Sequence, residues 1–552
     1  MRKRTVLFCN IIMLLALLAV PGISADVVLL WPDADIPADL TRLRTEQVAA
    51  QSGEKIKIEL FNKSRTAFIL GVPSLDTGYR PECSKGIEYR LYEIQDVPVP
   101  GKIKAEYPDL LMPLRETRQL QNSKQGGEYT WFWLEIFCRP EPLAGEDSLV
   151  ISAPDEKQRA VQIQIHRKTA APVPAPVHLI FNEYGPDYLD GFTGSAKEKA
   201  EFELAVFRQC RAEHGILMPL PYKSQRGTPR PGMAPEIEWI GRDSLKLDWE
   251  SFDRRFSPLL GGSAFPDGQP LEEFYLPFNP EWPAPFHLYW ENRPLYEKIW
   301  EITAREFIRH FRQKGWTQTH YQIYLNQKPG KRNRIPWHLD EPRGRKDLEA
   351  LAYFEKLTHR VFQDAEINFK FRVDISHWYC DKHRGHAQKD FELNGGPNLL
   401  KNVDLWCVSW HSLSGRRAAE RAVDLTATDK TVWLYGKTPL ITTPGTAVFK
   451  DLYSTWMNGW GGFLFWASFT DKIGEDDGFD FGWYQIPGEG TMRIAPSLRV
   501  KRLGSAVDDL IHLLRLSQGA SNGMALTRKM VAEYLSGDFA ARSKWYRAEK
   551  IK

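Results

Sequence analysis

Apolar and polar positions alternate along the first third of the chain in a way that is typical of β-strands. The segments KIKIELFN, IEYRLYEI, YTWFWLEIFC, DSLVISA and AVQIQIHR alternate or run β-branched and aromatic, with Gly, Pro and Asn between them. No long helical pattern interrupts these segments. We therefore predict an antiparallel β-sandwich domain over residues 26–168.

The pattern changes after residues 169–177, where prolines among small residues predict a semi-rigid linker. Eight apolar segments then alternate with helical patterns. The apolar segments are 178–184, 216–220, 273–278, 320–325, 369–376, 403–410, 431–436 and 462–468. The helical patterns are 195–214, 249–260, 293–314, 344–363, 415–424, 446–457 and 496–515. This alternation predicts a (β/α)8 TIM-type barrel over 178–515, followed by a helical tail over 516–552. An open doubly wound sheet is the alternative, although no glycine-rich phosphate loop follows the first strand.

The first 25 residues have the three parts of a secretory signal peptide. MRKR is basic, IIMLLALLAV is apolar, and PGISA ends in small residues before Asp26. A membrane anchor is the alternative, but the apolar run is short for a bilayer. Removing the segment changes the formal net charge of +3 to zero, because it carries three basic residues and no acid. We expect an exported protein, periplasmic or secreted, with no membrane span after cleavage and no basic surplus for nucleic acid.

Five cysteines remain after the signal segment, an odd and sparse set that is not typical of a disulfide framework. Cys83 and Cys138 both lie in the predicted β domain, and they are the pair most worth testing as a disulfide. The 19 Trp and 20 Tyr residues are a more suggestive feature, since flat amphipathic rings suit sugar binding as well as core packing.

Acidic and aromatic residues recur where the predicted barrel strands end. Active residues of TIM-type barrels lie at the carboxyl ends of the strands and in the loops that follow. A structural face alone would not require this recurrence. The candidate substrate-binding residues at these ends are Glu183, Tyr222, Trp337, His338, Asp374, Trp378, Trp410, Tyr435 and Trp466.

Two adjacent carboxylates, Asp340 and Glu341, follow the fourth strand and precede Pro342. One interpretation is that Asp340 caps a helix that begins near Pro342, with Glu341 favouring the helix dipole. The other is a paired-carboxylate catalytic site, as glycoside hydrolysis requires. A directly adjacent pair suits the variant in which the acetamido oxygen of the substrate attacks. Spacing alone leaves both interpretations open.

Four segments, WHLDEP, VDLWCVSW, WMNGWGGFLFWASF and GEGTMRIAPSLRVKRLGSAVDDLIHLL, together resemble bacterial glycoside hydrolase family 123 and the wider set that shares its catalytic domain (domain of unknown function 4091). The resemblance covers most of residues 176–515, and the preceding β domain matches the usual arrangement. It implies a barrel that removes N-acetylgalactosamine-type residues by substrate-assisted retaining hydrolysis, without a cofactor. By position, Asp340 resembles the residue that orients the acetamido group, and Glu341 resembles the acid/base.

Two other functions stay open. A conventional glycosidase would use Glu341 as the acid and a second carboxylate, such as Glu183 or Asp374, as the nucleophile. A non-catalytic carbohydrate-binding protein on a degraded barrel is the alternative from another class.

Two further segments admit more than one interpretation. The segment HWYCDKHRGH offers His377, Cys380, His383 and His386, but their spacing matches no common zinc site, so a polar rim loop is preferred and no metal is predicted. The basic run KPGKRNR (328–334) is interpreted as a solvated loop, with binding of an anionic sugar as the alternative.

Overall fold

The structure is a computed structural model of the 552-residue chain. The residues that it describes are 27–36, 45–73, 80–100, 105–114, 129–141, 144–152, 160–223, 226–241, 244–329, 335–362, 365–375, 396–410, 430–475, 477–478, 481–487 and 492–547. The predicted signal segment, the 415–424 helix, Trp378 and the His377–His386 segment lie outside the described residues.

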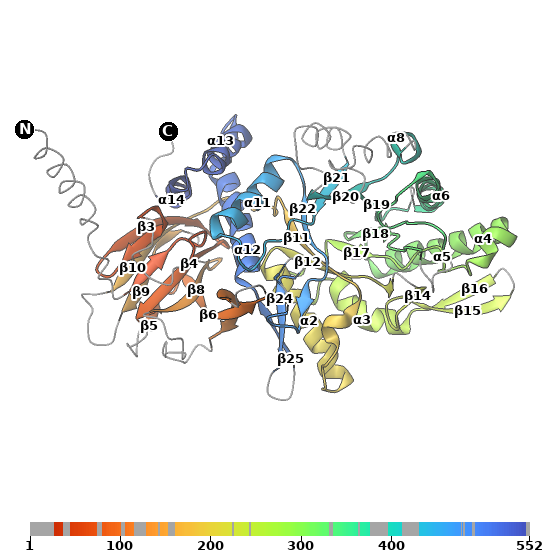
Figure 1. The fold of residues 1–552 in the computed structure, drawn as a ribbon, viewed down its shortest axis with the longest axis horizontal. Coiled ribbons are helices and arrows are strands. Elements are labelled where there is room, and N and C mark those ends of the chain that lie inside the picture. The colour runs from red at the N-terminus through yellow and green to blue at the C-terminus, as the bar shows by residue number, and fades with distance from the viewer. Residues whose placement is uncertain are drawn as a thin grey trace, which may run out of the picture.

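Two β-sheets form the N-terminal part of the molecule (Figure 1). The first sheet has the order β2 (Val48–Gln51), β1 (Val28–Leu30), β4 (Arg65–Pro73), β8 (Tyr129–Cys138), β6 (Ile87–Val99) and β7 (Ala105–Pro113). The second has the order β3 (Lys55–Phe61), β10 (Val161–Lys168), β9 (Gly145–Ser152) and β5 (Arg80–Cys83). Apolar side chains from both sheets belong to one buried cluster. The predicted sandwich is therefore confirmed, except that β3 and β10 pair in parallel.

The possible pairing of Cys83 with Cys138 is wrong, because both residues are free cysteines in the structure. Cys83 is exposed on β5, whereas Cys138 is buried on β8 in the other sheet. Burial raises the pKa of the Cys138 thiol to about 12. Cys138 therefore behaves as a small apolar core residue, since a buried thiol is inert.

Eight parallel strands form the nearly closed barrel that the alternating pattern predicts. The strands are β11 (His178–Glu183), β12 (Gly215–Pro219), β17 (Glu273–Tyr275), β18 (His320–Tyr324), β19 (Asn368–Ile375), β20 (Leu405–Ser409), β21 (Thr431–Tyr435) and β22 (Gly462–Phe465). β11 pairs with β22, which closes the ring on that side. β12 and β17 contact each other without ladder hydrogen bonds, so the ring is incomplete between them. The TIM-type fold is confirmed.

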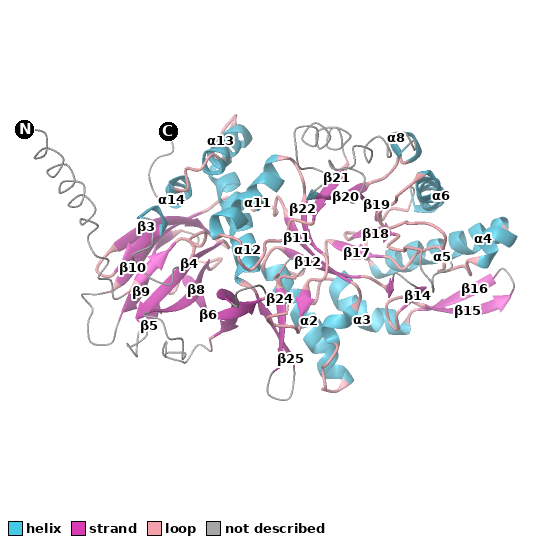
Figure 2. Ribbon diagram, in the orientation of Figure 1, coloured by secondary structure: helices cyan, strands magenta, loops and turns pink. Residues whose placement is uncertain are grey.

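Helices cover the outside of the barrel (Figure 2). Those that follow or flank barrel strands are α2 (Ala196–Ala212), α3 (Glu250–Leu260), α4 (His287–Glu291), α5 (Arg293–Lys314), α6 (Arg345–Phe362), α8 (Gly396–Leu399), α11 (Gly445–Met457) and α12 (Leu498–Leu516). Local sequence explains their ends: α2 begins with a capping box formed by Ser195 and Glu198, and α5 ends at Gly315 in the left-handed conformation.

Three small β-structures were not predicted from the sequence. The hairpins are β13 (Tyr222–Lys223) with β14 (Arg226–Pro229), and β15 (Glu236–Gly241) with β16 (Ser244–Asp248). The third is a sheet of β23 (Phe469–Thr470), β24 (Trp483–Pro487) and β25 (Met492–Pro496). They decorate the connections after β12 and β22, where the apolar pattern is too short to distinguish strands from loops.

The last barrel helix, α12, lies between the N-terminal sheets and the barrel (Figure 1). Its Lys501 and Asp508 are buried and form ion pairs with Glu135 of β8 (2.8 Å) and Arg65 of β4 (2.7 Å). The tail helices α13 (Gly523–Leu535) and α14 (Ala540–Tyr546) also pack inward, since Arg542 forms a buried ion pair with Asp509 of α12. Within the described part of the chain, no helix combines the length and apolarity needed to cross a bilayer.

Candidate active site

The loop after β18 folds back and returns the carboxylate pair to the end of that strand. The backbone amides of Leu339 and Asp340 donate to the carbonyl oxygen of Gln327 (2.9 and 3.2 Å). The Tyr324 hydroxyl, on the last residue of β18, then donates to Asp340 Oδ1 at 2.7 Å. The pair therefore lies at the carboxyl end of the barrel strands despite the long intervening segment.

The helix-cap interpretation of Asp340 is wrong. Helix α6 begins at Arg345 rather than near Pro342, and the carboxylate that supports its start is Asp347. Asp347 accepts the backbone amides of His338, Arg343 and Gly344 at 2.9, 2.9 and 3.0 Å. Asp347 thereby holds both ends of the short segment that carries the pair. The Asp340 carboxylate does not cap the helix and instead contacts Tyr324 and Lys328.

Glu341 has a backbone conformation that non-glycine residues rarely adopt, with φ at 57°. This left-handed conformation costs about 1–2 kcal/mol for an L-residue. The side chain is held by the Tyr435 hydroxyl, which donates to Glu341 Oε1 at 2.7 Å. It remains 18% exposed, so a sugar that reaches the barrel end can contact it.

A single lysine bridges the two carboxylates. Lys328 Nζ lies 3.0 Å from Asp340 Oδ2 and 3.0 Å from Glu341 Oε2. Burial alone would lower the pKa of Lys328, but the two carboxylates outweigh it and raise that pKa well above its usual value. Lys328 is therefore a fixed cation between the two acids.

Burial is the main reason that the pKa of Asp340 is raised from 3.8 to about 6. Lys328 and the Tyr324 hydroxyl oppose this change, whereas the nearby Asp374 and Glu341 carboxylates add to it. Asp340 is thus mostly ionised at neutral pH and takes up a proton in mildly acidic solution. A carboxylate that titrates near the working pH is a common feature of acid–base sites.

A second buried ion pair supports the site from inside the barrel. Arg372 Nε and Nη2 donate to the two oxygens of Asp374 at 2.7 and 2.8 Å, and both residues have no exposed surface. The Arg372 guanidinium also donates to the Tyr275 hydroxyl and lies 4.3 Å from the centre of the Tyr324 ring. This pair fixes Tyr324, which in turn holds Asp340. Burial raises the pKa of Asp374 although Arg372 opposes the change.

Aromatic rings extend from the carboxylates toward solvent. The Tyr435 and Trp466 rings meet edge to face at 5.5 Å, and Trp466 stacks on Tyr184 with ring centres 6.0 Å apart and planes 9° apart. Tyr184 is 46% exposed and Trp466 is partly buried. This stack, which the Tyr435 ring connects to Glu341, offers a flat face for a sugar ring.

Several predicted binding residues lie in the protein interior. Tyr222 is buried and donates its hydroxyl to the Tyr324 carbonyl oxygen (2.7 Å), which fixes the end of β18. Trp337 is 7% exposed and packs among the rings of Phe286, Tyr289, Trp290 and Phe354. Both residues support the strand or loop that carries the pair, and neither contacts the carboxylates in the described structure.

Glu183 and Trp410 lie at the ends of barrel strands, and His338 lies in the loop that carries the pair. Glu183 is 6% exposed and accepts the backbone amides of Tyr184 (3.1 Å) and Phe469 (3.3 Å). His338 is half-buried beside Asp347. Trp410 is half-buried with Lys437 Nζ 4.3 Å from its ring centre. Trp378 lies outside the described residues, so its predicted role stays a prediction.

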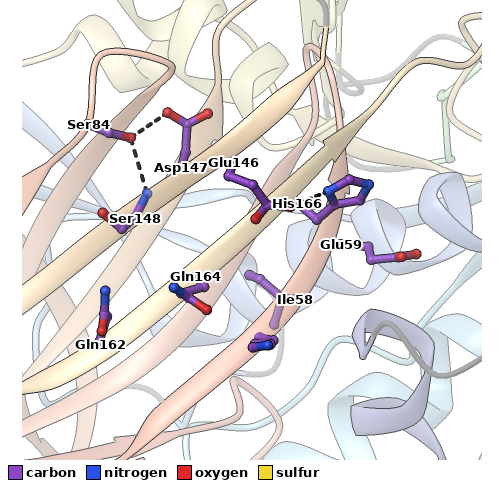
Figure 3. A pocket seen from close by; sticks show the side chains of 10 residues that line it. Ile58, Glu59, Ser84, Glu146, Asp147, Ser148, Gln162, Gln164 and His166 are labelled. Carbon is purple, nitrogen blue, oxygen red and sulfur yellow. Dashed lines mark hydrogen bonds and ion pairs between the residues drawn. The ribbon is translucent and has the colours of Figure 1, made fainter.

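A hollow of about 670 Å³ lies on the four-stranded sheet of the N-terminal domain (Figure 3). None of its lining residues belongs to the barrel. The acidic side chains of the hollow are already paired: Glu59 with Lys168, Glu146 with His166, and Asp147 with Arg167. None of its ten lining residues is Phe, Tyr or Trp. This hollow offers no stacking surface and no unpaired acid, so the chemistry is assigned to the barrel end.

Metal chemistry finds no support among the described residues, where no group of three or more His, Cys, Asp or Glu side chains is placed to hold an ion. The His377–His386 segment lies outside them.

Comparison with known proteins gives one informative similarity. No protein-family model and no curated protein sequence matches this chain. A family 123 glycoside hydrolase from Clostridium perfringens, described as hydrolysing glycolipid glycans, matches in structure with a TM-score of 0.59. The match covers 92% of this chain and 91% of that chain at 12% identity. The chain shares the fold of a family 123 glycoside hydrolase. A family 5 xyloglucanase from Bacteroides ovatus matches with a TM-score of 0.31 and 7% identity over 82% of this chain and 98% of that chain.

The structure adds Tyr324, Lys328 and Arg372 to the site residues that the sequence suggested. Tyr324 carries a usable signal, because it is the last residue of a barrel strand. Lys328 looks like one member of a basic run. Only the folded loop shows that its ammonium group lies between the two acids.

Proposed function

We propose that the protein is a glycoside hydrolase that acts on N-acetylhexosaminides, of the N-acetylgalactosamine type, by substrate-assisted retaining hydrolysis. The observation that carries this proposal is the adjacent Asp340 and Glu341 pair, held by Tyr324, Lys328 and Tyr435 at the carboxyl end of the barrel strands. The fold shared with a family 123 glycoside hydrolase supports it.

In the proposed reaction, the acetamido oxygen of the substrate attacks the anomeric carbon as the glycosidic C–O bond breaks. Glu341 gives its proton to the leaving oxygen, and Asp340 holds the acetamido N–H and balances the positive charge of the cyclic intermediate. Water then attacks the anomeric carbon while Glu341 takes back a proton, which returns the acetamido group and retains the anomeric configuration. The exposed Tyr184 and Trp466 rings provide a stacking face.

The environment of the other carboxylates favours this route over a conventional glycosidase. Asp374 is fully buried in its bidentate pair with Arg372, so it has no path to an anomeric carbon. Both carboxylate oxygens of Glu183 accept backbone amides, Oε1 from Tyr184 and Oε2 from Phe469. A conventional mechanism needs a second carboxylate that faces the sugar about 5 Å from the acid, and neither residue presents one.

The test is hydrolysis of aryl N-acetyl-β-galactosaminide and N-acetyl-β-glucosaminide, with the acetamido-free galactoside and glucoside in parallel. We expect only the acetamido sugars to be cleaved. Glu341→Gln and Asp340→Asn should each lower kcat/KM by about 10²–10⁴-fold. Cleavage of acetamido-free sugars would contradict the substrate-assisted route and favour the conventional one. Sugar binding without turnover in the wild type would favour a carbohydrate-binding protein.

Export is part of the same proposal, since glycans of this kind are met outside the cytoplasm. The basic and apolar stretches of the first 25 residues support cleavage before Asp26. Mass spectrometry of the protein from a secreting bacterial host should give an N-terminus at Asp26, and an intact Met1 in the membrane fraction would contradict cleavage.

A further inference from the structure

We propose that Lys328 is a positioning residue that keeps Asp340 ionised and thereby sets the acid limit of the activity. This inference rests on the proposed function of the Asp340 and Glu341 pair. It begins with geometry: one ammonium group lies 3.0 Å from an oxygen of each carboxylate. The Lys328 side chain is 40% exposed, whereas those of Asp340 and Glu341 are 11% and 18% exposed.

The substrate-assisted route needs the pair to hold one proton, because Glu341 must be an acid while Asp340 is a carboxylate. With Lys328 present, this singly protonated state has no net charge. Without Lys328, the same state carries one negative charge in a site that is largely shielded from water. Burying an uncompensated charge is costly, so the site would take up a second proton and Asp340 would become neutral.

The other groups around Asp340 do not replace Lys328. Arg372 is fully buried in its ion pair with Asp374, so its charge is already balanced. Tyr324 donates a hydrogen bond to Asp340 but carries no charge. The titratable groups that interact with Asp340 are Lys328, Glu341, Tyr222, Tyr324, Asp374 and Cys407. Arg372 interacts with Asp374, and Tyr435 interacts with Glu341 and Asp374. Lys328 is the cation among them that pairs directly with Asp340.

Lys328 also restrains the geometry of the pair. Asp340 Oδ1 is held by Tyr324 and Oδ2 by Lys328, while Glu341 Oε1 is held by Tyr435 and Oε2 by Lys328. Each carboxylate is therefore fixed at both oxygens, and the lysine is common to the two. This arrangement favours a single orientation of each acid before the substrate arrives.

The experiment compares wild type with Lys328→Met, Lys328→Gln and Lys328→Arg. We expect the acid limb of the kcat/KM–pH profile to move to higher pH by about 1–3 units in the Met and Gln variants. The lysine charge is lost in both, and an opposite charge at this distance lowers a carboxyl pKa by that amount. The Arg variant keeps a positive charge, so its acid limb should lie close to that of the wild type. Lys168→Met is the matched control, since Lys168 is 38% exposed and pairs with Glu59 on the N-terminal sheets. It should leave the profile unchanged.

A second measurement does not depend on turnover. Infrared difference spectroscopy follows the carboxyl band of Asp340, which is assigned by its loss in Asp340→Asn. The midpoint pH of its titration should be higher in Lys328→Met and Lys328→Gln than in the wild type. Unchanged titration of Asp340 would overturn the proposal. If the Lys328 variants lose activity only on anionic sugars and keep the acid limb of the wild type, the proposal is also overturned. Lys328 would then be a residue that contacts the substrate. If wild type cleaves no sugar, the titration still decides the role of Lys328 separately from the proposed function.

Discussion

Asp340 shows how an acid in the site affects both stability and activity. Burial raises its pKa to about 6, so the folded state disfavours the ionised form that the proposed reaction needs. The difference from the ordinary value of 3.8 corresponds to about 3 kcal/mol of lost stability when Asp340 is ionised. The sign follows from linkage: the folded pKa lies above the unfolded one, so the loss is complete above pH 6 and disappears as the pH falls toward 4.

Asp340→Asn should therefore stabilise the protein while it lowers kcat/KM. We expect a gain of about 3 kcal/mol in the free energy of unfolding at pH 7.5 and about half of that at pH 5. Urea denaturation at the two pH values measures it. Asp451→Asn is the matched variant, because burial also raises the pKa of Asp451 to about 6, and it should show the same pH trend with activity retained. A gain that is equal at both pH values would contradict the explanation.

Tyr435 tests the hydrogen bond that orients the acid. Tyr435→Phe removes only the hydroxyl that donates to Glu341 Oε1 at 2.7 Å. Glu341 becomes charged as it gives up its proton, and a hydrogen bond to a charged group contributes about 1.5–3 kcal/mol, so kcat should fall about 10- to 100-fold. The circular dichroism spectrum should be unchanged. Full activity in this variant would show that Glu341 is positioned by its other contacts alone.

At the scale of elements, the segment from His338 to Gly344 owes its shape to the first turn of α6. Asp347 accepts amides from both ends of this segment, so the helix start and the carboxylate pair form one local unit. The strained backbone of Glu341 lies within it. A substitution that disturbs the start of α6 should therefore also change the position of the carboxylate pair.

Asp347→Ala should lower both stability and activity. Loss of the amide acceptor should cost about 1–3 kcal/mol, measured by thermal and urea denaturation, and should lower kcat/KM at least tenfold. Glu198→Ala is the control, because Glu198 closes the capping box of α2 at an exposed position. It should change the stability less than Asp347→Ala does and leave kcat/KM unchanged. If both variants affect kcat/KM equally, the link between Asp347 and the site is wrong.

At the scale of the whole molecule, buried ion pairs join the N-terminal sheets to the barrel. Arg65 of β4 contacts Asp508 of α12 and Glu213 after α2, at 2.7 and 2.9 Å. Lys501 of α12 joins Glu213 to Glu135 of β8. Breaking a buried network leaves an uncompensated charge, which is more costly than the pair is worth. The sheets and the barrel should therefore unfold together.

Arg65→Met tests this coupling. We expect a loss of about 3–5 kcal/mol in the free energy of unfolding and a single transition by both fluorescence and circular dichroism. Arg309→Met, which removes an exposed pair with Glu306, should cost about 1 kcal/mol or less. Two separate transitions in the wild type would show that the sheets and the barrel are energetically independent.

The sequence by itself determined the barrel strands, the main helices that alternate with them and the class of fold. The ends of α2, α5 and α6 lie within two residues of the predicted ones, because caps, Gly315 and apolar periodicity act locally. Each of the eight predicted barrel strands overlaps a strand of the structure, since an apolar run between two helical patterns leaves few alternatives. The acids at residues 340 and 341 could also be found in the sequence, because they are neighbours along the chain.

The tertiary structure alone decided which groups surround the acids. Tyr324, Lys328 and Tyr435 lie 16, 12 and 95 positions from Asp340 along the chain, and only closure of the barrel and the return of the loop bring them into contact with the pair. It also separated the aromatic residues: Tyr184 and Trp466 form an exposed stack, whereas Tyr222 and Trp337 are buried. Burial and contact depend on how distant segments pack together, and the local pattern of apolar and polar residues does not specify that packing.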